Sequence, residues 1–138
     1  MMQENLSTEE LYRRCRELLN ANPYAMYNGV TIEHVDKDSV SVYTDLRPEF
    51  TNVYGMAHGG LISTLLDNCA GLTVRLDGDR HVTLDMNVCF FANITEGRLH
   101  ARSQMIKRGK TVNVMKVQAT SDEGKLLAEA TVTFFRIT

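Results

Sequence analysis

The spacing of apolar residues changes along this 138-residue chain, and each change predicts a different element. Near the N-terminus, apolar residues recur at helical spacing from Leu11 to Leu19, and residues 7–10 have the form of a capping box. We therefore expect an amphipathic helix over about residues 7–20, ended by Asn22-Pro23.

From Val30 the apolar residues alternate with polar ones, which predicts a strand hairpin that ends before Pro48. The second half repeats this alternation in four runs joined by short polar turns, and such short links require antiparallel pairing. These runs are 82–88, 99–105, 112–117 and 128–134. The apolar parity changes between Val114 and Met115, which predicts a β-bulge at that point.

The most apolar run of the chain lies between the hairpin and these strands. It predicts a helix from Gly59 to about Leu76 that is apolar around most of its circumference and is therefore buried. One strip of this helix is small or polar: Gly60, Ser63, Thr64, Asp67 and Gly71. The inventory predicts an α+β fold with a curved antiparallel β-sheet wrapped around a long central α-helix. We expect one domain over 1–138, with its core over about 30–138 and an extra N-terminal helix.

Charge and cysteine content narrow the function classes. The formal net charge is −2 and the basic residues are scattered, which argues against nucleic-acid and anionic-membrane partners. No signal peptide is recognisable, and no stretch approaches the roughly 18 apolar residues of a membrane span. Cys15, Cys69 and Cys89 are an odd set within apolar patterns, so we expect reduced, buried thiols in a cytoplasmic protein.

The start of the predicted central helix and the carboxylate within it form a candidate site. A glycine pair at a helix start leaves unpaired backbone N–H groups, and Asp67 in an apolar helix needs a partner or a function. The plainer alternative ties Asp67 to Ser63 or Asn68. Asp67 lies eight residues beyond Gly59, about 12 Å along the axis, which is too far to act on one carbonyl. A shared catalytic site therefore requires two antiparallel copies of the helix, with two sites per dimer.

These residues carry a resemblance to a known family. Asn52, Gly55 and His58-Gly59-Gly60, followed by Leu66-Asp67, resemble the signature of hotdog-fold acyl-CoA thioesterases of the phenylacetate-degradation type. The similarity continues through 83–87 and 108–110 and covers about residues 30–138. It implies the hotdog fold of the 4-hydroxybenzoyl-CoA thioesterase-like superfamily, with hydrolysis of an acyl-CoA to free acid and CoA.

The resemblance implies four catalytic residues. The Gly59 backbone N–H would polarise the thioester carbonyl, assisted by the Asn52 side chain. Asp67 of the partner chain would activate water as a general base or attack directly as a nucleophile. Thr83 stands where the family has a hydroxyl, familiarly a serine, that helps to orient the water.

The resemblance also implies substrate-binding residues: His58, Gly60, Tyr54, Phe90, Phe91, Arg108 and Lys110. His58 would brace the loop rather than act as the base, and Arg108 and Lys110 would meet the CoA phosphates. The three aromatic residues would line the acyl or pantetheine channel. Because Phe90 and Phe91 are consecutive, we expect one to face the core and the other a channel or an interface.

Several alternatives stay open at this stage. A non-catalytic acyl-CoA-binding protein of the same fold is the first rival, and an enoyl-CoA hydratase is a weaker one, because position 72 holds Leu72 where that family usually has a histidine. The histidines lack metal-ligand spacing and Cys69 fits the core, so we expect no metal and no cofactor apart from the CoA of the substrate. The implied assembly is a homo-oligomer, a dimer with shared sites that pairs again as a dimer of dimers.

Overall fold

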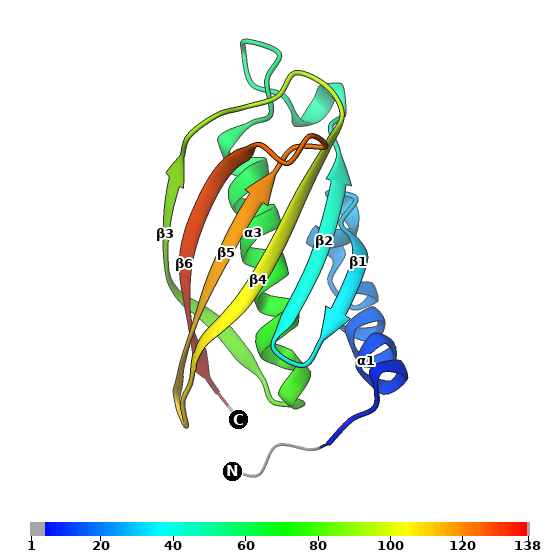
Figure 1. Cartoon of the computed structure of the whole chain (residues 1–138), viewed down its shortest axis with the longest axis vertical. Helices are drawn as coiled ribbons and strands as arrows, with labels where there is room; N and C mark the ends of the chain where they lie inside the picture. The colour runs from blue at the N-terminus through cyan, green and yellow to red at the C-terminus, as the bar shows by residue number, and fades with distance from the viewer. Residues whose placement is uncertain (1–4, 138) are drawn as a thin grey trace.

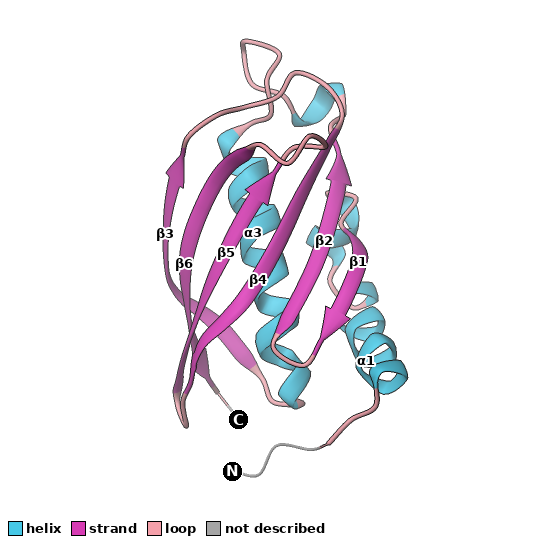
Figure 2. Cartoon of the chain, in the orientation of Figure 1, coloured by secondary structure: helices cyan, strands magenta, loops and turns pink. Residues whose placement is uncertain are grey.

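A computed structural model describes residues 5–137 and shows one antiparallel sheet of six strands curved around a central helix (Figure 1). The strand order across the sheet is β1-β2-β4-β5-β6-β3. The strands are β1 (Thr31–Asp36), β2 (Ser39–Asp45), β3 (His81–Phe90), β4 (Arg98–Arg108), β5 (Val112–Thr120) and β6 (Leu126–Arg136). One face of the sheet carries no helix in the described residues (Figure 2), and the central helix covers the other. The predicted α+β architecture is confirmed.

The N-terminal helix α1 (Thr8–Asn20) forms as its capping box predicts, with the Ser7 hydroxyl accepting the Glu10 N–H at 3.2 Å. A second short helix, α2 (Pro23–Tyr27), was not expected. Asn22-Pro23 is predicted only to end α1, but the Asn22 side chain also caps α2 by accepting the Ala25 N–H at 3.1 Å. Proline at the first helical position suits this start, because that position needs no N–H donor.

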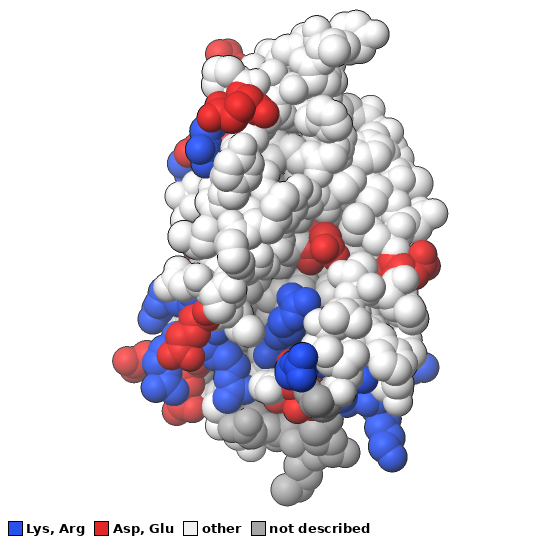
Figure 3. Space-filling view, turned by 180° about the vertical axis from the view of Figure 1, so that it is seen from behind, with Lys and Arg blue, Asp and Glu red and all other residues white. Residues whose placement is uncertain are grey.

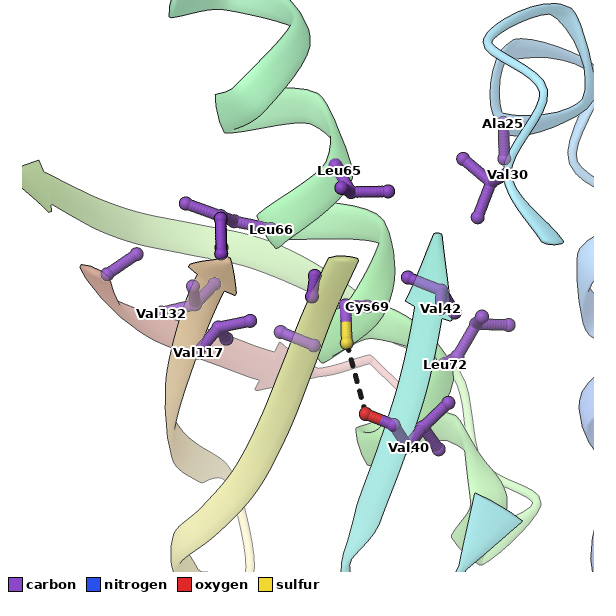
Figure 4. Close-up of a cluster of buried hydrophobic side chains, with 14 of the residues drawn as sticks. Ala25, Val30, Val40, Val42, Leu65, Leu66, Cys69, Leu72, Val117 and Val132 are labelled. Carbon is purple, nitrogen blue, oxygen red and sulfur yellow. Dashed lines mark hydrogen bonds between the residues drawn. The ribbon is translucent and has the colours of Figure 1, made fainter. Parts of the chain in front are cut away.

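The central helix α3 (Gly59–Val74) is followed by a 3-10 turn, η2 (Arg75–Asp77), so helical structure extends to the predicted end. It packs against β2, β3, β4, β5 and β6. Leu65, Leu66 and Cys69 are buried in this core, and the Cys69 thiol donates to the Val40 carbonyl at 3.2 Å (Figure 4). Burial raises the pKa of the Cys69 thiol to about 12, so Cys69 is a core residue and no nucleophile.

Strand β3 lies at the edge of the sheet, and a bulge changes which of its side chains face α3. Its register with β6 shifts between Thr83 and Asp85, so Leu84 is the extra residue. Thr83 pairs with buried Phe134, and beyond the bulge Met86 pairs with buried Val132. Residues directly opposite each other share a face, so both Thr83 and Met86 face α3. Strict alternation places them on opposite faces, and the bulge removes that conflict.

The bulge predicted in β5 lies in its partner strand. The register between β4 and β5 shifts between Met105 and Lys107. β5 itself alternates without a break because Asn113 takes a fully buried inward position, where its side chain accepts the Gly109 N–H at 2.9 Å. A buried polar residue therefore broke the apolar parity, rather than an extra residue in β5.

The end of β3 is more exposed than its sequence predicts. The side chains of Phe90 and Phe91 are 50% and 60% exposed, so the expectation that one of them faces the core is wrong for this protomer. Cys89 is exposed, whereas Cys15 and Cys69 are buried as expected. None of the helices within residues 5–137 is long and apolar enough to cross a membrane.

Candidate active site

The N-terminus of α3 leaves one backbone donor unused. The His58 side chain caps the helix, with Nδ1 accepting the Gly60 N–H at 2.8 Å. The His58 carbonyl accepts the N–H groups of Leu61 and Ile62 at 2.9 and 3.1 Å. Within residues 5–137 the Gly59 N–H has no acceptor. This donor therefore points out of the helix end, where an oxygen carrying negative charge would be stabilised.

The loop before α3 is held by Asn52. Its side-chain oxygen accepts the N–H groups of Tyr54 and Met56 at 2.9 and 3.1 Å, and its own N–H donates to the Met56 carbonyl at 2.8 Å. The side-chain NH₂ of Asn52 has no partner among the described residues. The carbonyl end of this amide therefore shapes the loop, and the NH₂ end is left to act as a donor.

Aromatic side chains surround the same helix end. The Phe90 ring lies beside Gly59, where a Cβ would be 3.7 Å from Cζ of the ring. Tyr54 is 79% exposed at the loop tip, and Phe91 projects from the end of β3. Phe90 thus gives the donor end of α3 an apolar neighbour, and Tyr54 and Phe91 are exposed on the two segments that lead to and from this end of the molecule.

Asp67 and Thr83 contact each other farther along α3, beside its second half. The Thr83 hydroxyl donates to Oδ1 of Asp67 at 2.7 Å, and Asp67 is half-buried. The alternative ties to Ser63 and Asn68 are not formed, because Asn68 donates to the Thr64 carbonyl and accepts from Asn22. The carboxylate is therefore oriented by a hydroxyl from the neighbouring strand, which leaves Oδ2 available for a water molecule or a carbonyl carbon.

Arg108 and Lys110 lie at the β4–β5 turn, near the end of the molecule where α3 finishes (Figure 1). Arg108 donates from Nη1 to the Asp77 carboxylate at 2.8 Å and is mostly buried. The Lys110 side chain is exposed, and its carbonyl accepts from Arg136 at 2.6 Å. Lys110 is therefore free to meet an anion, whereas the Arg108 charge is already paired.

The partner of Arg108 belongs to a buried ionic cluster that the sequence did not reveal. The Asp77 carboxylate accepts from Arg136 at 2.8 Å and from His81 Nε2 at 3.0 Å, besides Arg108. Burial alone would raise the pKa of Asp77, but hydrogen bonds from the Asp79 N–H, Arg136 and His81 outweigh it and lower that pKa. Burial lowers the pKa of His81. In the sequence, residues 77–79 indicate only a turn.

The candidate residues therefore fall into two groups at different levels of α3. One group surrounds its N-terminus: Asn52, Tyr54, His58, Gly59, Gly60, Phe90 and Phe91. The other lies beside its second half: Asp67, Thr83, Arg108 and Lys110. Because α3 is continuous, Gly59 and Asp67 are about 12 Å apart along the axis. Figure 3, viewed from the helix side, shows charged side chains concentrated in the lower part of the molecule and little charge over most of the surface above.

Among residues 5–137 no group of three or more His, Cys, Asp or Glu side chains is placed to hold a metal ion.

Comparison with known proteins identifies the class. A family profile described as the thioesterase superfamily matches residues 54–128. Human acyl-coenzyme A thioesterase 13 is 33% identical over 127 residues, which cover 88% of this chain and 91% of that protein. The PaaI protein of the phenylacetic acid degradation operon of E. coli superimposes with a TM-score of 0.90 at 19% identity, covering 95% of this chain and 96% of that one. A thioesterase from Pseudomonas aeruginosa gives a TM-score of 0.83 at 21% identity, covering 96% and 95%.

The chain belongs to the thioesterase superfamily, and its curved sheet around α3 is the hotdog fold of that family. It is a thioester hydrolase.

Proposed function

We propose that the protein hydrolyses an acyl-CoA to the free acid and CoA at two sites per dimer. Each site joins the Gly59 N–H and the Asn52 amide of one protomer to Asp67 and Thr83 of its partner. The observation that carries the proposal is the separation within one chain of an unused oxyanion donor and an oriented carboxylate. The two groups can serve one thioester only if they come from different copies.

The reaction follows from these positions. The Gly59 N–H binds the thioester oxygen as it gains negative charge, helped by the dipole of α3. Asp67 takes a proton from water while the hydroxide adds to the carbonyl carbon, or its own oxygen forms an acyl–enzyme that water then cleaves. In the first route, collapse of the tetrahedral intermediate breaks the C–S bond and the CoA thiolate takes up the proton from Asp67. In the second route the C–S bond breaks as the acyl–enzyme forms, and the CoA thiolate takes up a proton from the water that cleaves the acyl–enzyme. Thr83 holds Asp67 through the 2.7 Å hydrogen bond in either route.

Two surfaces support this pairing. The edge strand β3 presents apolar side chains to solvent, with Val82 45%, Leu84 59% and Phe90 50% exposed. An exposed apolar edge strand is prone to pair with another strand. On α3, Gly60 and Ser63, the small residues that precede Asp67, permit close approach of a second helix. We infer a dimer that pairs β3 with β3, and a dimer of dimers as the full assembly.

The substrate is an aryl-acyl or medium-chain acyl-CoA, and the protein acts in the cytoplasm without a cofactor. The structural likeness to a protein of the phenylacetic acid degradation operon supports testing aryl-acyl groups first. Lys110 meets the CoA phosphates, with Arg108 beside it, and Tyr54, Phe90 and Phe91 line the channel. Because these residues lie at opposite ends of one α3, antiparallel pairing brings them to the same site.

A complementation experiment tests the shared site. Gly59→Pro removes the free N–H at the first position of α3, where proline fits and the preceding His58 is already extended. Gly59→Ala is the matched control, because it keeps the N–H and its Cβ makes only ordinary contact with Phe90. Gly59→Pro and Asp67→Asn should each be inactive as homodimers. When the two variants are refolded together, one site of each mixed dimer regains both groups, so about a quarter of wild-type activity should return.

Release of thiol from a panel of aryl and straight-chain acyl-CoAs is the readout. Recovery on mixing supports the shared site, and absence of recovery in dimers shown to be mixed would overturn it. A protein that binds acyl-CoA tightly but releases no thiol would be the non-catalytic rival.

A further inference from the structure

Arg75 reaches back along α3 toward Asp67. It is the first residue of η2, and its side chain lies over Gly71, since a Cβ at Gly71 would collide with Nη1. Asp67, Gly71 and Arg75 follow one another at intervals of four residues, so they occupy neighbouring positions on one side of the helix. Gly71 is therefore the gap that allows the guanidinium to approach the turn that carries Asp67.

The guanidinium is fixed in this position by two of its three nitrogens. Nε and Nη2 donate to the His81 carbonyl at 3.3 and 2.8 Å, and the group stands 5.8 Å from the centre of the Phe134 ring. Nη1 has no partner within the described residues. Burial lowers the pKa of Arg75, and the negative charge of Asp67 counters part of that shift. The cation is thus anchored and partly desolvated on the side of α3 that carries Asp67.

We propose that Arg75 is a positioning residue for the reaction, whose positive charge over Gly71 attracts the Asp67 carboxylate and keeps it aimed at the thioester held by the partner protomer. The proposal rests on the function proposed above, because Asp67 must be the base or nucleophile. The Asp67 carboxylate acts as an anion in both routes, and a fixed cation in a partly buried setting attracts an anion more strongly than a cation in bulk water does. Neither the family motif nor the residues that touch the thioester include Arg75.

Two variants separate charge from hydrogen bonding. Arg75→Gln keeps a donor for the His81 carbonyl but loses the charge, and Arg75→Lys keeps the charge with a single donor group. We expect Arg75→Gln to lower kcat about tenfold with KM unchanged, and Arg75→Lys to restore most of the loss. Arg80→Gln, which removes an exposed cation from the same end of the molecule, should leave both constants as in the wild type.

A second substitution tests the path through Gly71. Gly71→Ala forces the guanidinium away and should lower kcat to a similar extent, but it should have no further effect in the Arg75→Gln background. Thermal unfolding and molecular mass of every variant show whether the fold and the dimer persist. Ala at this helical position does not weaken the helix itself.

The outcomes distinguish this inference from the proposed function. If Asp67→Asn is inactive and Arg75→Gln retains wild-type kcat, the role of Arg75 is overturned and the catalytic role of Asp67 stands. An active Arg75→Gln together with a slow Arg75→Lys would assign Arg75 to holding the His81 carbonyl instead. Additive losses in the Gly71 and Arg75 double variant would also contradict the proposal. Wild-type activity of Asp67→Asn would remove the proposed function first.

Discussion

The two ends of α3 differ in how they present functional groups. At the N-terminus a backbone donor stands free with the apolar Phe90 ring as a neighbour, and the side chain of His58 is occupied in capping. Beside the second half of the helix, Asp67 is held by Thr83, and the chain then enters the ionic cluster centred on Asp77. One end offers an unpaired backbone N–H without a carboxylate beside it, and the other offers an oriented carboxylate about 12 Å along the axis from that donor.

Under the proposed mechanism, this difference makes a single protomer chemically incomplete. A helix cannot bend its two ends together, so a motif that is compact in sequence is extended over about 12 Å in space. On the face shown in Figure 3, charged side chains are concentrated in the lower part of the molecule, and the buried ionic cluster of Asp77 lies just beyond the C-terminus of α3. Substitutions in the second half of α3 and in the residues around it should therefore have effects that range from loss of hydrolysis to a small rise in KM.

The largest expected effect comes from removing the carboxylate in the second half of α3. Asp67→Asn should lower kcat by about 10²–10⁴-fold, because the amide can neither accept a proton from water nor attack the thioester. Asp85→Asn, an exposed carboxylate on the same strand as Thr83, is the control and should keep wild-type turnover. Steady-state thiol release measures both. Equal activity of the two variants would remove Asp67 from the mechanism.

The second-largest expected effect comes from removing the buried anion of the ionic cluster around Asp77. Asp77→Asn leaves Arg108 and Arg136 without their buried anion, and it should lower the free energy of unfolding by about 3–5 kcal/mol. Urea unfolding at neutral pH measures the loss. Asp79→Asn, at the rim of the cluster, should cost much less.

The same cluster predicts a pH dependence of stability. The pKa values of both His81 and Asp77 are lower in the folded protein, so each group stabilises the fold most above its unfolded pKa. Stability should begin to fall below about pH 6.5 as unfolded chains protonate the histidine, and fall further below about pH 4 for the carboxylate. His100 gives the opposite slope, because burial alone would lower its pKa but hydrogen bonds with Asp122 and Glu33 outweigh burial and raise it, so the profile is compared in a His100→Asn background. A flat profile between pH 7 and pH 5 in that background would contradict the His81 contribution.

A smaller effect sharpens the link between Asp67 and β3. Thr83→Ala should lower kcat about tenfold, because a hydrogen bond to a charged carboxylate is lost. Thr83→Ser keeps the hydroxyl and should stay close to the wild type in kcat. If alanine and serine behave alike, the hydroxyl does not orient Asp67.

The smallest effect concerns binding alone. Lys110→Ala should raise KM about threefold and leave kcat unchanged, since an exposed cation contributes little and is screened by salt. Lys125→Ala, in the turn at the other end of the sheet, is the matched control. The difference between these variants should shrink as ionic strength rises. A fall in kcat for Lys110→Ala would point to a role beyond phosphate contact.

Much of the fold could be predicted from local patterns. The capping box at Ser7 and the glycine pair before the apolar run predicted the starts of α1 and α3, because both patterns act within a few residues. The order of strands in the sheet was beyond these patterns, since β3 pairs with β6 rather than with β4. The wrong prediction of a bulge in β5 came from one residue, Asn113. This polar residue is buried because its side chain accepts a hydrogen bond from the β4–β5 turn, which its local sequence does not indicate.

The sequence predicted which residues belong to the candidate site more fully than it predicted how they contact one another. The separation of Gly59 from Asp67 followed from helix geometry alone, and the structure retains it. The contact of Thr83 with Asp67 required the bulge at Leu84, for which alternation gives no signal. Arg75 was not predicted from the sequence, because its side chain extends back toward the N-terminus of α3 to lie over Gly71. The four-residue spacing of Asp67, Gly71 and Arg75 was present in the sequence.

The exposed thiol of Cys89 has a practical consequence for measuring turnover. Cys15 and Cys69 are buried with pKa values raised to about 12, so disulfide reagents that detect released CoA will react with the protein at Cys89. Cys89 lies on the edge strand β3, so in the proposed dimer its labelling would compete with association of two protomers along that edge. Its rate of modification at increasing protein concentration gives an internal measure of dissociation, and Cys89→Ser separates that signal from catalysis.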